Sequence, residues 1–78
     1  MSLKADKQLN YLGLYCPVPV LKTKVELEKI AVGQTLEIVA DDPAAESDLQ
    51  SLARSTGQEV LAIQKKGKEI HVFIKKNR

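Results

Sequence analysis

Cys16 is the residue with the clearest chemistry in this 78-residue chain, because it is the only cysteine and lies where a helix is expected to begin. It belongs to the run Gly13-Leu14-Tyr15-Cys16-Pro17-Val18-Pro19. A thiol at a helix N-terminus faces unpaired backbone N–H groups and the positive end of the helix dipole. Both favour the thiolate, which is the nucleophilic form. Pro17 and Pro19 suit the first turn, where a backbone N–H has no partner to lose.

A single sulfur favours carrying a group over forming an internal disulfide. The other polar residues indicate weaker chemistry. Asp41 and Asp42 precede Pro43, and we expect Asp42 to cap a helix while Asp41 lies on a solvated turn. His71 is expected on the exposed face of a strand and not as a ligand or a base. One cysteine and one histidine cannot complete a tetrahedral zinc site alone, so no metal or cofactor is predicted.

The lysines are unevenly distributed in a chain with a formal net charge of +2. Lys22 and Lys24 follow Cys16 within two helical turns, where they could stabilise an anion on the sulfur or meet an acidic partner. Lys22 falls on the same side of the helix as Leu21 and Val25. Ordinary solvated faces explain the remaining lysines better than a dedicated site for a polyanion.

Hydrophobic periodicity and turn residues predict six elements in the order β-α-β-α-β-β. Strands are expected at 8–12, 35–40, 59–64 and 69–75, and helices at 17–30 and from Asp42-Pro43 to a C-cap at Gly57. This order predicts a two-layer α/β (α+β) sandwich with a mixed four-stranded sheet, parallel pairs, a closing hairpin, and both helices on one face.

The size and composition indicate one small domain over 1–78, with a core at about 8–76. Hydrophobic residues make up 44% of the chain and charged residues 28%, which is typical of a globular domain. Neither a signal-like start nor an apolar run of roughly 20 residues is present, so we expect a cytoplasmic protein. We also expect a monomer.

The first predicted helix has more apolar surface than one sheet can cover. One arc, expected to face the sheet, contains Val20, Thr23, Leu27, Ile30 and Ala31. A second stripe contains Val18, Leu21 and Val25. Either the buried arc is wide, or the second stripe and Tyr15 form an exposed apolar surface for a partner beside Cys16.

The run around Cys16 resembles the Cys-Pro-x-Pro signature of the TusA/SirA-like sulfur-carrier family. The similarity continues through Lys22-Thr23-Lys24, the Gly33 turn, the segment 35–44 with its Asp-Asp-Pro-Ala, and the Gly57 segment. It covers roughly residues 8–76. The resemblance implies a two-layer sandwich in the same β-α-β-α-β-β order.

The resemblance also implies that Cys16 accepts sulfane sulfur as a persulfide, with Pro17 and Pro19 shaping the entry to the helix. It implies two partners: a donor such as a cysteine desulfurase or a rhodanese, and an acceptor protein. Known destinations in the family include 2-thiouridine formation in tRNA and other sulfur trafficking. Such a protein is a sulfurtransferase-like carrier, acting by persulfide transfer, and not an independent turnover enzyme.

Three positions depart from the common family pattern. Asn10 follows Leu9 where many members have Asp, Gln58 follows Gly57 where many have His, and Val18 separates the prolines where the residue is often acidic or larger. These positions bear on the choice of partner and leave the acceptor cysteine in place.

Two other functions are compatible with the chain. A small RNA-binding module would use the lysines, but Phe73 and Tyr11 are its main candidates for base stacking. A thiol-based regulatory or adaptor domain would use Cys16 as an oxidant sensor and would need a resolving cysteine from another chain.

Overall fold

The computed structural model describes residues 5–15 and 18–78, so Cys16 and Pro17 lie outside the described residues. Six elements follow in the predicted order. They are β1 (Lys7–Tyr11), α1 (Val18–Lys29), β2 (Thr35–Ala40), α2 (Ala45–Thr56), β3 (Glu59–Lys66) and β4 (Glu69–Lys75). The element types and order are therefore those that the sequence predicts.

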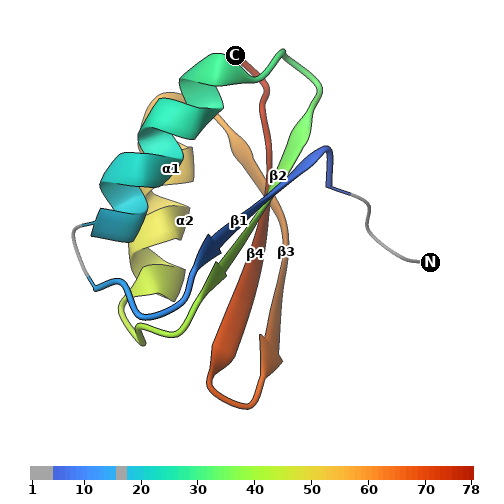
Figure 1. The fold of residues 1–78 in the computed structure, drawn as a ribbon. Helices are drawn as coiled ribbons and strands as arrows, with labels where there is room; N and C mark the ends of the chain where they lie inside the picture. The colour runs from blue at the N-terminus through green and yellow to red at the C-terminus, as the bar shows by residue number, and fades with distance from the viewer. Residues whose placement is uncertain (1–4, 16–17) are drawn as a thin grey trace.

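The four strands form one mixed sheet in the order β1-β2-β4-β3 (Figure 1). β1 runs parallel to β2, with Tyr11 opposite Ala40. β4 lies between β2 and β3 and is antiparallel to both, with Ile70 opposite Ala40. The sheet thus has one parallel pair, since β4 separates β3 from β2. The carboxyl ends of β1 and β2 and the β3–β4 hairpin consequently lie at the same end of the sheet.

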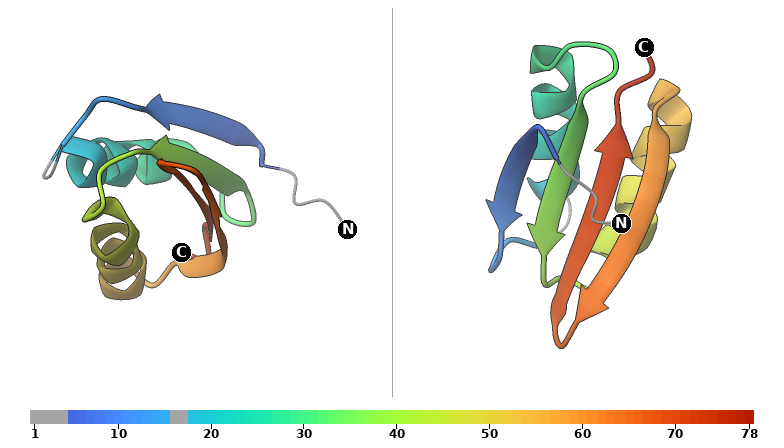
Figure 2. Two further views of the ribbon diagram at one scale, coloured as in Figure 1. Left: turned by 90° about the horizontal axis from the view of Figure 1, so that it is seen from below. Right: turned by 90° about the vertical axis from the view of Figure 1, so that its right-hand side faces the viewer.

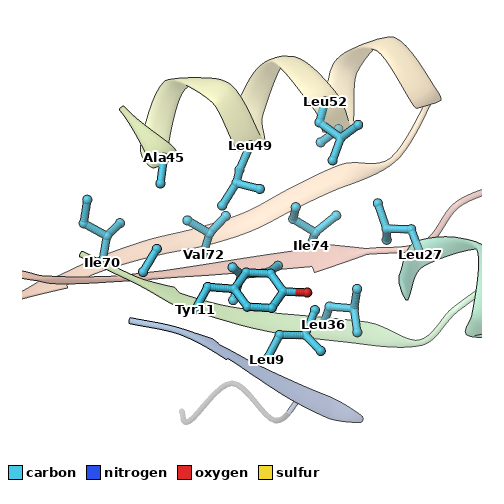
Figure 3. Close-up of a cluster of buried hydrophobic side chains, with 13 residues drawn as sticks. Leu9, Tyr11, Leu27, Leu36, Ala45, Leu49, Leu52, Ile70, Val72 and Ile74 are labelled. Carbon is cyan, nitrogen blue, oxygen red and sulfur yellow. The ribbon is translucent and has the colours of Figure 1, made fainter. Parts of the chain in front are cut away.

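Both helices cover the same face of the sheet, and the opposite face carries no helix (Figure 2). This is the two-layer architecture expected from the sequence. Aliphatic side chains from both layers meet in the core, where Leu49 of α2 lies near Val72 and Ile74 of β4 (Figure 3). Leu36, Ile38, Leu49, Val72 and Ile74 are fully shielded from solvent. Their burial is the main favourable term in the stability of so small a fold.

On β4, the face of the sheet that carries no helix is less exposed to solvent than we expect for His71. Ile70, Val72 and Ile74 point to the core, yet Phe73 on the other face is only 4% exposed. β4 is an inner strand, so Phe73 has a neighbour on both sides, opposite Glu37 of β2 and Ala62 of β3. Side chains on a strand with a neighbour on both sides are more shielded from solvent than the alternation of polar and apolar residues alone indicates.

His71 is likewise held on this face and not simply exposed. Its Nδ1 lies 2.7 Å from Oε2 of Glu37, and its Nε2 lies 3.2 Å from Oε1 of Glu69. Each ring nitrogen has its own carboxylate, which gives His71 a structural role in joining β2 to β4.

Several boundaries differ from the sequence-based ones by one or two residues. α2 begins at Ala45, after a turn through Pro43 and Ala44, and not directly at Asp42-Pro43. The predicted N-cap is wrong: Ala44 occupies that position and no described side chain caps α2. Asp42 instead stabilises the preceding turn, where its Oδ1 accepts from Ala44 N at 3.0 Å and its carbonyl accepts from Ala45 N at 2.9 Å. β3 is longer than predicted and contains a register shift between Val60 and Ala62. The predicted C-cap is confirmed, because Gly57 follows α2 in a left-handed conformation.

Neither helix in the described part of the chain is long and apolar enough to cross a membrane.

Candidate functional site

The site predicted around Cys16 lies at the end of the sheet where β1 and β2 finish. Cys16 and Pro17 themselves are outside the described residues, but the chain on both sides is defined. Tyr15 and Val18 are the described residues on either side of them, and Val18 N donates to the carbonyl of Tyr15 at 2.9 Å. In Figure 1 the loops that follow β1 and β2 lie together at the lower end of the molecule.

The loop between β1 and Tyr15 has its backbone hydrogen bonds satisfied at three successive residues. Leu12 N donates to Oδ1 of Asn10 at 3.1 Å, Gly13 N donates to Oδ1 of Asp41 at 3.0 Å, and Leu14 N donates to the carbonyl of Tyr11 at 3.1 Å. Exposed loops usually leave such donors to water. This loop is therefore ordered by specific acceptors up to the residues that precede Cys16.

For two of these acceptors, Asp41 and Asn10, the structure changes or extends what the sequence predicts. Asp41 was expected on a solvated turn, whereas it is half-buried and bonded to Gly13. The signal that could have found it is topological: β1 and β2 are parallel neighbours, so the residues that follow them meet. Asn10 replaces the Asp common in the family, and its side-chain oxygen accepts a hydrogen bond as a carboxylate would.

On the helix side, a buried polar chain links the end of β1 to the first turn of α1. Thr23 Oγ1 donates to the carbonyl of Pro19 at 2.7 Å, and the Thr23 hydroxyl is also hydrogen-bonded to that of Tyr11. Thr23 and Pro19 are fully buried. Burial, with a smaller effect from Glu26, raises the pKa of Tyr11 more than the bond to Thr23 lowers it. Pro19 thus fills space under the helix as well as suiting its first turn.

The second apolar stripe of α1 is exposed, which answers the question that the sequence left open. Tyr15 is 68% exposed, Leu21 58% and Val25 49%, and Val18 is exposed at the start of the helix. The arc facing the sheet includes Thr23 and Leu27, with Val20 and Ile30 packed at the edge of the core. We call Tyr15, Val18, Leu21 and Val25 the apolar collar.

A shallow groove of about 460 Å³ runs between the collar side of α1 and strand β1. Its walls are formed by four residues of β1 and four of α1, namely Gln8, Leu9, Asn10, Tyr11, Leu21, Lys22, Val25 and Glu26. Lys22 therefore lies on the collar side, as the helical wheel predicts. Lys24 faces another cleft, shared with Leu27 and the C-terminal residues Lys76 and Arg78.

The charges beside the groove are partly paired. Glu26 forms an ion pair with Lys7 of β1 and a second, at 3.5 Å, with Lys29. The hydrogen bond from Lys7 lowers the pKa of Glu26, so the carboxylate remains ionised around neutral pH. Lys22 is the other charged residue in the groove wall, which gives that wall a positive edge next to the apolar collar.

The RNA-binding alternative finds little support in the described residues. Tyr11 and Phe73, the aromatic candidates for base stacking, are both buried and so have no free ring face to offer a base. Within residues 5–15 and 18–78, no group of three or more His, Cys, Asp or Glu side chains could hold a metal ion.

Comparisons with known proteins add independent evidence. A family model described as "Sulfurtransferase TusA" matches residues 7–76. The chain is 36% identical over 72 residues to the "Sulfur carrier protein TusA" of Allochromatium vinosum, covering 92% of this chain and 95% of that protein. It is 48% identical over 59 residues to a protein of Archaeoglobus fulgidus with a provisional sulfur-carrier name, covering 76% and 77% of the two chains.

A solved structure shows the same fold. The crystal structure of a SirA-like protein from Desulfitobacterium hafniense superposes with a TM-score of 0.81 at 25% sequence identity. The match covers 92% of this chain and 99% of that one. The arrangement of two helices on a β1-β2-β4-β3 sheet is thus shared over nearly the full length of both proteins.

Proposed function

Because the chain belongs to the TusA/SirA-like sulfur-carrier family, we propose that Cys16 accepts sulfane sulfur as a persulfide and passes it to an acceptor protein. The family assignment rests on the match over residues 7–76 and on the relatives above. The structural observation that carries the proposal is the apolar collar. It leaves large side chains exposed on the helix that follows Cys16, as a sulfur carrier that docks on other proteins requires.

Loading requires one thiolate exchange. The Cys16 thiolate attacks the outer sulfur of a donor persulfide, a new S–S bond forms on Cys16, and the bond within the donor persulfide breaks to release the donor thiolate. Delivery repeats this exchange, with an acceptor thiolate attacking the outer sulfur on Cys16. Electrons balance in each step, so the carrier itself needs neither a cofactor nor an external oxidant.

The chain's contribution is to present this sulfur to two different proteins. An ordered loop before Cys16, a helix after it, and the exposed side chains of Tyr15 and Val18 on either side suit transfer between active sites better than an enclosed pocket does. In this proposal the positive end of the α1 dipole stabilises the thiolate. Pro17 and Pro19 shape this helix entry.

The docking surface in this proposal consists of the apolar collar together with Lys22. Tyr15, Leu21 and Val25 supply apolar contact area, and Lys22 supplies a cation at its edge. An acidic rim on the partner would complement Lys22 and would mainly accelerate association. Donor and acceptor use the same surface in turn, since both must reach Cys16.

The destination of the sulfur is proposed at the level of the family. Delivery to a tRNA 2-thiolation pathway, or to other sulfur trafficking, is consistent with a monomeric carrier. We place the reaction in the reducing cytoplasm, where the thiol persists between transfers.

The experiment that tests the proposal is intact-mass spectrometry of the reduced protein after incubation with a cysteine desulfurase, pyridoxal phosphate and L-cysteine. The expected result is a gain of one sulfur atom that dithiothreitol removes. The Cys16→Ser variant should show no gain while retaining the wild-type circular dichroism spectrum.

A rhodanese with thiosulfate serves as a second donor, so that the test does not depend on a single donor protein. If the folded protein gained no sulfur from either donor, the carrier function would be wrong. A gain that persisted in Cys16→Ser would equally rule out Cys16 as the acceptor.

A further inference from the structure

We propose that Asp41, at the end of β2, is a positioning residue that holds the Cys16 loop in place through Gly13. This inference rests on the proposed function, because it assigns to Asp41 a role in presenting Cys16 for sulfur transfer. Asp41 lies 28 residues away from Gly13 in sequence, and its Oδ1 accepts a hydrogen bond from Gly13 N at 3.0 Å.

The contact involves the backbone at the point where the loop turns. Gly13 has a φ of +82°, a conformation that side chains other than hydrogen disfavour. Among the described residues, and apart from the two chain neighbours of Gly13, no atom lies within 4 Å of the position that a Cβ on Gly13 would take. The hydrogen bond to Asp41 is therefore the described contact that links Gly13 to a distant part of the chain.

Asp41 is itself well anchored on its sheet side. The residue before it, Ala40, is 1% exposed and is paired with both Tyr11 of β1 and Ile70 of β4. The residue after it, Asp42, begins the hydrogen-bonded turn into α2. A side chain fixed between an inner strand and a helix start makes a firm acceptor for the neighbouring loop.

The other acceptors described for residues 12–14 lie in the adjoining end of β1. Asn10 and Tyr11 accept from Leu12 and Leu14 within the same short segment, so those bonds shape the loop locally. The bond to Asp41 instead ties the loop to β2 and, through it, to the start of α2. It thereby fixes where the loop lies relative to the rest of the fold.

Asp41 also carries a negative charge, and its two effects on Cys16 have opposite signs. Losing the hydrogen bond releases the loop that precedes Cys16 from β2, which we expect to slow the reaction of the thiolate. Losing the charge alone removes an anion bonded to that loop and favours the thiolate, which accelerates the reaction. Asp41→Asn removes the charge but keeps a side-chain oxygen acceptor, whereas Asp41→Ala removes both.

The test measures the rate of Cys16 alkylation by iodoacetamide as a function of pH in the wild type and in both variants. At neutral pH we expect Asp41→Asn to react at least as fast as the wild type. We expect Asp41→Ala to react about three to ten times more slowly than Asp41→Asn, the range that one net hydrogen bond supports. Glu59→Ala, which removes an exposed carboxylate at the far end of β3, is the matched control and should leave the profile unchanged.

Protection of the Gly13 amide against hydrogen exchange gives a second readout. It should persist in Asp41→Asn and be lost in Asp41→Ala, while the β4 amides stay protected in both. If Asp41→Ala does not fold, Asp41→Ser, whose hydroxyl is too short to reach Gly13 N, takes its place. Equal alkylation profiles for the Asn and Ala variants would overturn the proposal.

Failure of the proposed function gives a different pattern. A wild-type protein that accepts no sulfur from either donor would disprove sulfur carriage, yet its alkylation profile and amide protection would still report on the Asp41–Gly13 link. Normal sulfur loading with identical Asn and Ala profiles would disprove only the role of Asp41.

Discussion

The two helices have the same length of 12 residues and cover the same sheet, but they distribute their apolar side chains differently. α2 buries Ala45, Leu49, Leu52 and Ala53, and none of the exposed large hydrophobic residues belongs to it. α1 buries Pro19, Thr23 and Leu27, and leaves Val18, Leu21 and Val25 in solvent.

This difference separates residues that stabilise the fold from residues available to a partner. A helix that serves only the core places its apolar residues on one stripe, as α2 does. α1 instead carries a buried stripe interrupted by the polar Thr23, and a second stripe beside Cys16. The apolar collar adds little to folding, so its side chains are free to serve docking.

The largest expected effect contrasts one leucine from each helix. Leu49→Ala should lower the free energy of unfolding by about 2–5 kcal/mol, because Leu49 is fully buried and its truncation leaves a cavity. Leu21→Ala should change it by less than ~0.5 kcal/mol, since the side chain is mostly in solvent. Urea unfolding of the two variants measures both values. A comparable loss from Leu21→Ala would place the collar in the core.

The second prediction tests whether the apolar collar contributes more to sulfur loading than other exposed apolar residues do. Leu21→Ala should slow sulfur loading from a limiting donor by about tenfold, which corresponds to ~1.4 kcal/mol of lost contact in the transfer complex. Val32→Ala is the matched control, because Val32 is similarly exposed, at 64%, but follows the other end of α1. Rapid-quench mass spectrometry measures the loading rates. Equally slow loading by both variants would contradict a special role for the collar.

The smallest effect concerns the polar chain beneath α1. Tyr11→Phe should cost about 1 kcal/mol at neutral pH by removing the hydroxyl bonded to Thr23. Because burial raises the pKa of Tyr11, the folded protein retains the phenolic proton at a pH where the unfolded chain has lost it. The wild type therefore loses stability as the pH rises through the alkaline range between these two pKa values.

Phe has no proton to lose, so the stability difference between wild type and Tyr11→Phe should narrow above about pH 10. Urea unfolding at a series of alkaline pH values measures this difference. A stability difference that stayed constant with pH would show that Tyr11 ionises equally in the folded and unfolded states.

The fold was predictable because its signals are local. Alternation, turn glycines and helical spacing specified each element within one or two residues, and their order specified the two-layer class. The position of β4 between β2 and β3 was not visible in these patterns, since strand order depends on long-range pairing. The burial of Phe73 followed from that same order and was missed with it.

The candidate site was predictable in part. Cys16, Pro17 and Pro19 are marked by their motif, and the helical wheel separated the collar from the core-facing arc. The wheel could not decide whether the collar was exposed, because that depends on how α1 is rotated on the sheet. Asp41 was assigned to a solvated turn, since only the parallel pairing of β1 and β2 brings it to Gly13.

β1 lies at the edge of the sheet, and this position affects the order in which the strands unfold. β1 has five residues and one neighbouring strand, whereas β4 is bonded along both sides. Edge elements detach at a lower free energy than inner ones, so we expect β1 to open before β2 and β4. The bond between Asp41 and Gly13 therefore joins the loop before Cys16 to β2, the neighbouring strand that opens later.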